Sequence, residues 1–184
     1  MPNDQSPIIL AFSGGLDTSF CVPWLKENYG REVITACVDT GGIDAEAAIA
    51  LEKRARALGA IEHVLVDAKQ DFFDTVIRYL IAGNVLRGQA YPLCVGAERG
   101  LQAERLAKIA TERGATTVAH GCTAAGNDQV RFEVALRTLN PDLESLAPVR
   151  DNNWVRDEQL QYLEKNGLPL PPQGSAYSIN RGLW

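Results

Sequence analysis

The chain has 184 residues, of which 46% are hydrophobic and 22% are charged, and its net charge is −5. These values predict one soluble globular domain of ordinary size. No apolar run approaches the ~20 residues of a membrane span, and the acidic and basic residues are interspersed, unlike the basic surface of a nucleic-acid-binding domain. We therefore expect neither a membrane nor a nucleic acid as a partner.

Residues 1–7 have neither the basic nor the apolar region of a signal peptide. The cysteines lack the C-x-x-C spacing of metal and redox sites, which predicts free thiols in a reducing compartment. We therefore expect a cytoplasmic location. The four cysteines are Cys21, Cys37, Cys94 and Cys122.

Apolar runs and amphipathic stretches alternate along the chain. This order predicts an α/β fold, a doubly wound parallel sheet of about five strands. Because ligands bind beyond the carboxyl ends of such strands, the loops after Phe12, Val38 and His120 are expected to meet at one crevice. The expected strands cover residues 8–12, 33–38, 61–66, 116–120 and 143–147, the expected helices 20–29, 44–58, 71–81, 101–113 and 157–166, and irregular segments 82–100, 121–129 and 168–184.

A glycine turn, residues 13–19, lies between the first strand and the first helix, with the sequence Ser-Gly-Gly-Leu-Asp-Thr-Ser. It is not a Walker A loop, because no lysine precedes Lys26, and it is not the G-x-G-x-x-G dinucleotide motif. Bare amides and hydroxyls at a helix start predict a phosphate site, to which Asp17 contributes either by placing Mg2+ or by favouring the helix start. The alternative is an ordinary βα turn.

A second polar segment, residues 121–133, follows the expected strand that ends at His120. The amide of Asn127, the carboxylate of Asp128 and the guanidinium of Arg131 suit an amino-acid zwitterion. The alternative is an Asx turn followed by a salt-bridged helix start. We expect His120 itself to be a buried structural histidine.

The glycine turn resembles the SGGxD[ST] loop of the N-type ATP pyrophosphatases, which implies an adenine nucleotide alpha-hydrolase-like fold. Two further segments, His-Gly-x-Thr-x-x-Gly-Asn-Asp-Gln-Val-Arg-Phe-Glu from His120 and Ala-Tyr-Ser-Ile-Asn from Ala176, make the chain similar to the argininosuccinate synthase family. The resemblance implies a carbon–nitrogen ligase of arginine biosynthesis that joins citrulline to aspartate. It would use ATP and Mg2+, pass through a citrullyl-adenylate, and release AMP and pyrophosphate.

The resemblance also implies roles for individual residues. No protein nucleophile is needed, and Asp17, Asn127, Asp128 and Arg131 would act by positioning. The residues that would bind ATP are Ala11, Phe12, Ser13, Gly14, Gly15, Leu16, Asp17, Thr18, Ser19, Val38 and Gly121; those that would bind aspartate are Thr123, Asn127 and Asp128; and those that would bind citrulline are Tyr91, Gly96, Asn127, Arg131 and Ser178.

The chain departs from the family pattern after Tyr91, where Pro-Leu-Cys-Val-Gly replaces the commoner Leu-Leu-Gly-Thr-Ser. Gly96 has no hydroxyl, so either a backbone amide or water substitutes for it, or the substrate tail differs. The resemblance covers the N-terminal half of the family. It therefore implies a nucleotide-binding domain over residues 1–167, and residues 168–184 would begin a linker into a C-terminal synthetase and oligomerisation domain of a tetramer.

Two other functions stay open. One is the nucleotide-binding module of another adenylating ATP pyrophosphatase, and the other is a fragment that binds nucleotide without turnover. In every case, Gly14→Val and Gly15→Val are expected to abolish ATP binding and to leave the fold intact, because a Cβ would intrude where phosphate must approach.

Overall fold

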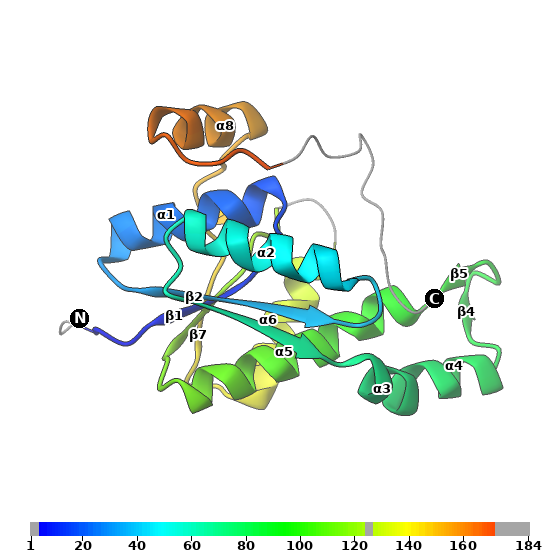
Figure 1. The fold of residues 1–184 in the computed structure, drawn as a ribbon. Helices are drawn as coiled ribbons and strands as arrows, with labels where there is room; N and C mark the ends of the chain where they lie inside the picture. The colour runs from blue at the N-terminus through cyan, green and yellow to red at the C-terminus, as the bar shows by residue number, and fades with distance from the viewer. Residues whose placement is uncertain (1–3, 124–126, 172–184) are drawn as a thin grey trace.

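The computed structural model describes residues 4–123 and 127–171 and contains a central sheet of five strands. All neighbouring strands are parallel, in the order β3-β2-β1-β6-β7. This confirms the predicted doubly wound parallel sheet (Figure 1). The strands are β1 (Ile8–Ala11), β2 (Val33–Asp39), β3 (Glu62–Asp67), β6 (Thr117–Ala119) and β7 (Glu144–Leu146).

Helices cover both faces of the sheet, and a two-stranded antiparallel hairpin projects from one end (Figure 1). Helices α3 and α4 are joined by a π-helical segment, η1, into one helical run over residues 69–82. The helices are α1 (Leu16–Tyr29), α2 (Ala45–Ala57), α3 (Lys69–Phe72), η1 (Phe73–Ile77), α4 (Arg78–Ala82), α5 (Cys94–Glu112), α6 (Asp128–Leu139), α7 (Pro148–Asp151) and α8 (Arg156–Lys165), and the hairpin consists of β4 (Leu86–Arg87) and β5 (Tyr91–Pro92).

The side chains of β1 alternate between two cores because successive strand residues point to opposite faces. Ile8 and Leu10 pack with α1, whereas Ile9 packs with α5 and α6. On the α1 side a further layer is added by α8, whose Tyr162 lies edge-on to Phe20 with ring centroids 5.2 Å apart. Helix α1 is therefore covered on two sides, which fixes the position of the turn that precedes it.

Two expectations for the middle of the chain were wrong. The segment 82–100 is not irregular, because it contains the hairpin and the first two turns of α5, which begins at Cys94 rather than at residue 101. Helix α6 begins at Asp128, inside the segment 121–129 that was expected to be irregular, and a helix start there was considered only as an alternative. Gly96 and Gly100 lower the helix propensity of the α5 start, but α5 packs along α6 and the sheet, and this burial outweighs the propensity.

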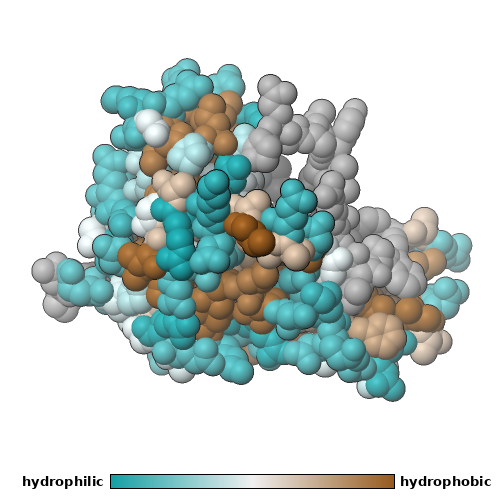
Figure 2. Space-filling view, viewed as in Figure 1, coloured by the Kyte–Doolittle hydropathy of each residue, from teal (hydrophilic) through white to brown (hydrophobic). Residues whose placement is uncertain are grey.

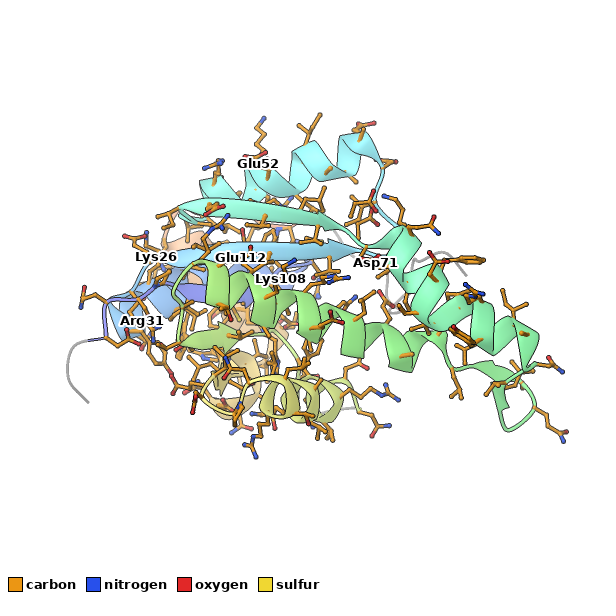
Figure 3. All side chains as sticks on the ribbon, turned by 90° about the horizontal axis from the view of Figure 1, so that it is seen from below. Lys26, Arg31, Glu52, Asp71, Lys108 and Glu112 are labelled. Atoms are coloured by element: carbon orange, nitrogen blue, oxygen red, sulfur yellow. The ribbon has the colours of Figure 1, made fainter. Side chains whose placement is uncertain are left out.

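The strands enter the sheet near Arg31 and leave it near Asp71, so these two labelled residues mark the amino and carboxyl ends of the sheet (Figure 3). Figure 2 shows hydrophobic side chains gathered at the projecting end that carries α4 and the hairpin. None of the helices in the described ranges combines the length and the apolar character that a bilayer crossing requires.

Candidate functional site

A cavity of about 420 Å³ lies beyond the carboxyl ends of β1, β2 and β6. The chain reverses its direction of progress across the sheet between β1 and β6, and such a switch point is where open α/β sheets bind ligands. Phe12, Val38 and His120 all line the cavity, which confirms that the three loops converge. Its size falls within the range of small-molecule sites.

The glycine turn follows β1 directly, and several of its residues line this cavity. Gly15 is the residue before α1 and offers no side chain to cap the helix, so the first amides of α1 have no side-chain acceptor there. The hydroxyls of Ser13 and Thr18 lie 3.3 Å apart, and Thr18 donates to the Gly15 carbonyl at 3.3 Å. These bonds are long, which leaves amides and hydroxyls suited to an anion at the helix start.

The two glycines of the turn have different surroundings. Gly14 has a φ of +73°, and a Cβ there would lie 2.6 Å from Cδ2 of Leu51 on α2. Gly15 has a φ of −73°, and a Cβ there would meet only the Ser13 hydroxyl, at 3.5 Å. A side chain at Gly14 would therefore be strained, whereas Gly15 faces open space in the cavity. Contrary to the expectation from the sequence, Gly14→Val should therefore destabilise the fold.

Gly121 brings the loop after β6 against the start of α1. A Cβ at this position would lie 2.9 Å from Cγ2 of Thr18 and 3.1 Å from Cβ of Asp17. Both Gly121 and Asp17 line the cavity. The close approach therefore joins the glycine turn and the second polar segment into one site.

Opposite charges meet at the start of α6. Asp128 accepts a hydrogen bond from Nη1 of Arg131 at 2.9 Å, and its other oxygen lies 3.3 Å from Nε of Arg99. The salt-bridged helix start considered as an alternative is therefore present. Asp128 and Arg99 also line the cavity, so the same carboxylate serves the local structure and faces the ligand space.

Gly96 lies beside Arg131. A Cβ on Gly96 would lie 3.4 Å from the Cζ, Nε and Nη2 atoms of Arg131. The Gly96 amide donates to the carbonyl of Leu93 at 3.1 Å, so the α5 start already uses this donor. A serine hydroxyl at position 96 would instead be placed against the guanidinium.

The structure brings most of the predicted residues to the cavity, but not all of them. Leu16 and Ser19 are buried behind the turn, and Asn127 is exposed at the α6 start. Tyr91 lies on β5, with its side chain outside what the structure describes, and Ser178 lies outside the described residues altogether. The predicted residues that line the cavity are Ala11, Phe12, Ser13, Gly15, Asp17, Thr18, Val38, Gly121, Thr123 and Asp128.

Several lining residues were missed by the prediction, notably Arg99 and Gln102 on α5 and Phe132 on α6. The signal for the first two is present in the sequence, because Glu98, Arg99 and Gln102 have the three- and four-residue spacing of neighbours on one helix face. It went unnoticed because the segment was predicted to be irregular up to Gly100.

Two cysteines and one histidine of the cavity stay neutral near pH 7. Burial raises the pKa of Cys122 to about 11 and that of Cys37 to about 12, so neither thiol is a ready nucleophile. Burial lowers the pKa of His120 to about 4. The ring of His120 stacks on Phe132 with centroids 5.6 Å apart, and its Nδ1 accepts from the Cys122 amide at 3.3 Å. His120 is buried, as expected.

We expect His120 to make stability depend on pH. Its pKa in the folded state, about 4, is below the ordinary value of 6.5, so the unfolded chain binds more protons between these values and stability falls as pH decreases. Between pH 7 and pH 5 this loss should be about 2 kcal/mol. Urea unfolding at both pH values should show the loss, and His120→Gln should remove it. An equal pH dependence in His120→Gln and in the parent chain would contradict the prediction.

The parallel sheet, the switch-point cavity and the glycine turn at a helix start define an α/β ligand-binding domain with a turn suited to an anion. The family model described as "Arginosuccinate synthase N-terminal HUP domain" matches residues 7–169. The chain belongs to the argininosuccinate synthase family.

Curated relatives show the same relationship. Argininosuccinate synthase of Lactococcus lactis subsp. cremoris (strain MG1363) is 45% identical over 179 residues, which are 96% of this chain and 44% of that protein. The corresponding protein of Bacillus pumilus (strain SAFR-032) is 43% identical over 183 residues, or 99% of this chain and 45% of that protein. The chain therefore spans less than half the length of the curated relatives that it matches.

Proposed function

We propose that the cavity binds ATP and that the chain carries the adenylation step of argininosuccinate synthesis. In this step the ureido oxygen of citrulline attacks the α-phosphorus of ATP and pyrophosphate leaves. The amine of aspartate then attacks the ureido carbon of the citrullyl-adenylate. The bond from that carbon to the former ureido oxygen breaks, and AMP departs carrying this oxygen. The observation that carries the proposal is the meeting of the glycine turn and the Asp128 loop in one cavity of a chain from this family.

We assign a different ligand group to each of the loops that line the cavity. Residues 11–19 would hold the ATP phosphates, with Val38 and Gly121 against the rest of the nucleotide. Thr123, Asn127 and Asp128 would bind aspartate. No step needs a protein nucleophile, in agreement with the protonated thiols of Cys37 and Cys122, and the protein would act by positioning the substrates and by stabilising charge. The residues proposed for citrulline are Tyr91, Gly96, Asn127, Arg131 and Ser178.

Magnesium fits this site as a partner of ATP. Proteins usually bind Mg2+ through one or two carboxylates together with substrate phosphates. Asp17 supplies one carboxylate residue to the lining of the cavity, to which Thr18 also belongs. No group of three potential metal ligands exists within the described parts of the chain. The ion would neutralise phosphate charge, and Asp17 would help to hold it.

We also propose how this chain is divided into domains and what assembly it belongs to. Residues 1–167 would be the nucleotide-binding domain, and residues 168–184 would lead towards a synthetase and oligomerisation domain of a cytoplasmic homotetramer. The length of the curated relatives supports this division. The same difference in length also supports the alternative in which this chain binds nucleotide without turnover.

Isothermal titration of ATP–Mg2+ into the 184-residue chain tests the proposal, first alone and then with citrulline and aspartate, while pyrophosphate is measured. Binding with citrulline-dependent pyrophosphate release would support adenylation by this chain. Binding without pyrophosphate would assign it the nucleotide-binding role alone. Absence of ATP binding would refute the proposal.

Asp128→Ala should weaken aspartate binding by about tenfold, because a hydrogen-bonded charge is removed, and should leave ATP binding within about twofold. Titration of each ligand measures the difference. Asp128→Asn serves as the control of equal shape. If both affinities fall equally, the role of Asp128 is to hold Arg99 and Arg131 rather than to bind substrate.

A further inference from the structure

A line of polar side chains crosses the wall of the cavity and joins three elements. We call it the polar bridge; it runs from the loop after β2, through α5, to the start of α6. The three elements are distant in the sequence: the first two members lie 58 positions apart. In order along the bridge they are Thr40, Glu98, Gln102, Arg99 and Asp128.

Gln102 is the central member and uses both ends of its amide. Its Nε2 donates to Oε1 of Glu98 at 2.7 Å, and its Oε1 accepts from Nη1 of Arg99 at 2.9 Å. Both partners lie on α5 at helical spacing, where side chains three and four residues apart are neighbours. Because an amide has one donating and one accepting end, these two bonds determine which way Gln102 points.

The first end of the bridge is anchored in the core. Thr40 follows β2 and is only 3% exposed, and its hydroxyl donates to the same Glu98 oxygen at 2.7 Å. Glu98 therefore accepts from two elements at once and cannot turn without breaking a bond to each. Neither Thr40 nor Glu98 lines the cavity, whereas Gln102 and Arg99 do.

The other end of the bridge is incomplete. Nε of Arg99 is buried and has no hydrogen-bond partner among the described residues, although Asp128 Oδ2 lies 3.3 Å away. A buried N–H without a partner is unfavourable. Gln102 thus holds the Arg99 guanidinium on one side and Asp128 lies on the other. Because Arg99 lines the cavity, its positive charge can attract a carboxylate ligand there.

We propose that Gln102 and Glu98 are positioning residues for the amino-acid side of the cavity. They hold Arg99 so that its guanidinium and the Asp128 carboxylate present a fixed pair of opposite charges to an amino-acid substrate, carboxylate to Arg99 and ammonium to Asp128. This inference rests on the proposed function and deepens it by naming two residues that act through Arg99.

The amide and the carboxylate can be exchanged without loss of any bond, which gives a sharp test. Gln102→Glu sets a carboxylate against Glu98 and breaks the bridge. Adding Glu98→Gln restores it, because the new amide at 98 accepts from Thr40 and donates to the carboxylate at 102, which still accepts from Arg99. The matched control is Gln70→Glu, since Gln70 donates to Asp74 at 2.8 Å on exposed helical surface, also four residues on.

Aspartate is titrated into each variant in the presence of saturating ATP–Mg2+, and ATP–Mg2+ is titrated separately. Gln102→Glu should weaken the affinity for aspartate by about tenfold, which corresponds to the loss of one hydrogen bond to a charged group. The affinity for ATP should stay within about twofold of the wild-type value. The double variant should recover wild-type affinity, and Gln70→Glu should match the wild type.

Three results would overturn the inference: equal loss of both ligands, failure of the exchange to restore aspartate binding, or a wild-type chain that binds ATP–Mg2+ but no aspartate. The last result would leave the proposed nucleotide site standing. A wild-type chain that binds no ATP–Mg2+ would remove the proposed function, and the inference with it. Melting temperatures, measured in parallel, identify a variant that fails to fold. If Gln102→Glu fails to fold, the aspartate affinity of the double variant with Glu98→Gln decides whether the inference holds.

Discussion

Gly15→Val should abolish detectable ATP binding, with an affinity loss of more than about 100-fold, while the chain stays folded. The added side chain meets nothing closer than the Ser13 hydroxyl at 3.5 Å and otherwise occupies the cavity at the helix start. The loss of a favourable helix cap should lower stability by no more than about 1 kcal/mol. Calorimetric titration of ATP–Mg2+ and urea unfolding measure the two effects.

Gly14→Val provides the contrast, because it should lower stability by about 3 kcal/mol through its left-handed backbone and its overlap with Leu51. Gly100→Ala is the control: Gly100 lies in α5, where an added Cβ meets no atom within 4 Å. It should leave ATP binding unchanged and raise stability by up to about 1 kcal/mol, because alanine has the higher helix propensity. If Gly15→Val binds ATP normally, or if it unfolds as readily as Gly14→Val, the turn is not the phosphate site that we propose.

Arg31→Met should lower the free energy of unfolding by about 3 kcal/mol. The Arg31 side chain is 6% exposed, and its guanidinium donates to the Ser6 carbonyl at 2.7 Å and to the Thr117 hydroxyl at 2.8 Å. It thereby joins the segment before β1 to β6 at the amino ends of the strands (Figure 3). Removing it leaves several polar groups without a partner. Urea unfolding measures the change.

Arg113→Met is the matched control. Like Arg31, Arg113 donates two short hydrogen bonds, here both to Glu62, at 2.6 and 3.1 Å. Unlike Arg31, it is exposed, because both side chains of this pair are more than one-third exposed. Exposed pairs contribute little, about 0–1 kcal/mol. ATP binding should be unchanged in both variants, because Arg31 lies at the opposite end of the sheet from the cavity. Equal destabilisation by the two substitutions would contradict the argument from burial.

Local sequence patterns predict some elements of this fold, and contacts between distant residues determine others. The strands at the centre of the sheet were predicted to within one or two residues, because strands such as β1 and β2 are mostly apolar and are buried on both faces. The starts of α5 and α6 were not predicted, since Gly96 and Gly100 weaken the local pattern and the helices are stabilised by packing on each other.

By itself the sequence determined the α/β order of elements, the turn at residues 13–19 and the family resemblance, because each depends on residues adjacent in the chain. Only the tertiary structure decided that Gly14 serves packing while Gly15 faces the cavity, and that Arg99 and Gln102 line it. Those properties depend on contacts such as Gly14 with Leu51 and Arg99 with Asp128. The partners are separated by tens of residues, and no local pattern specifies which distant side chains meet.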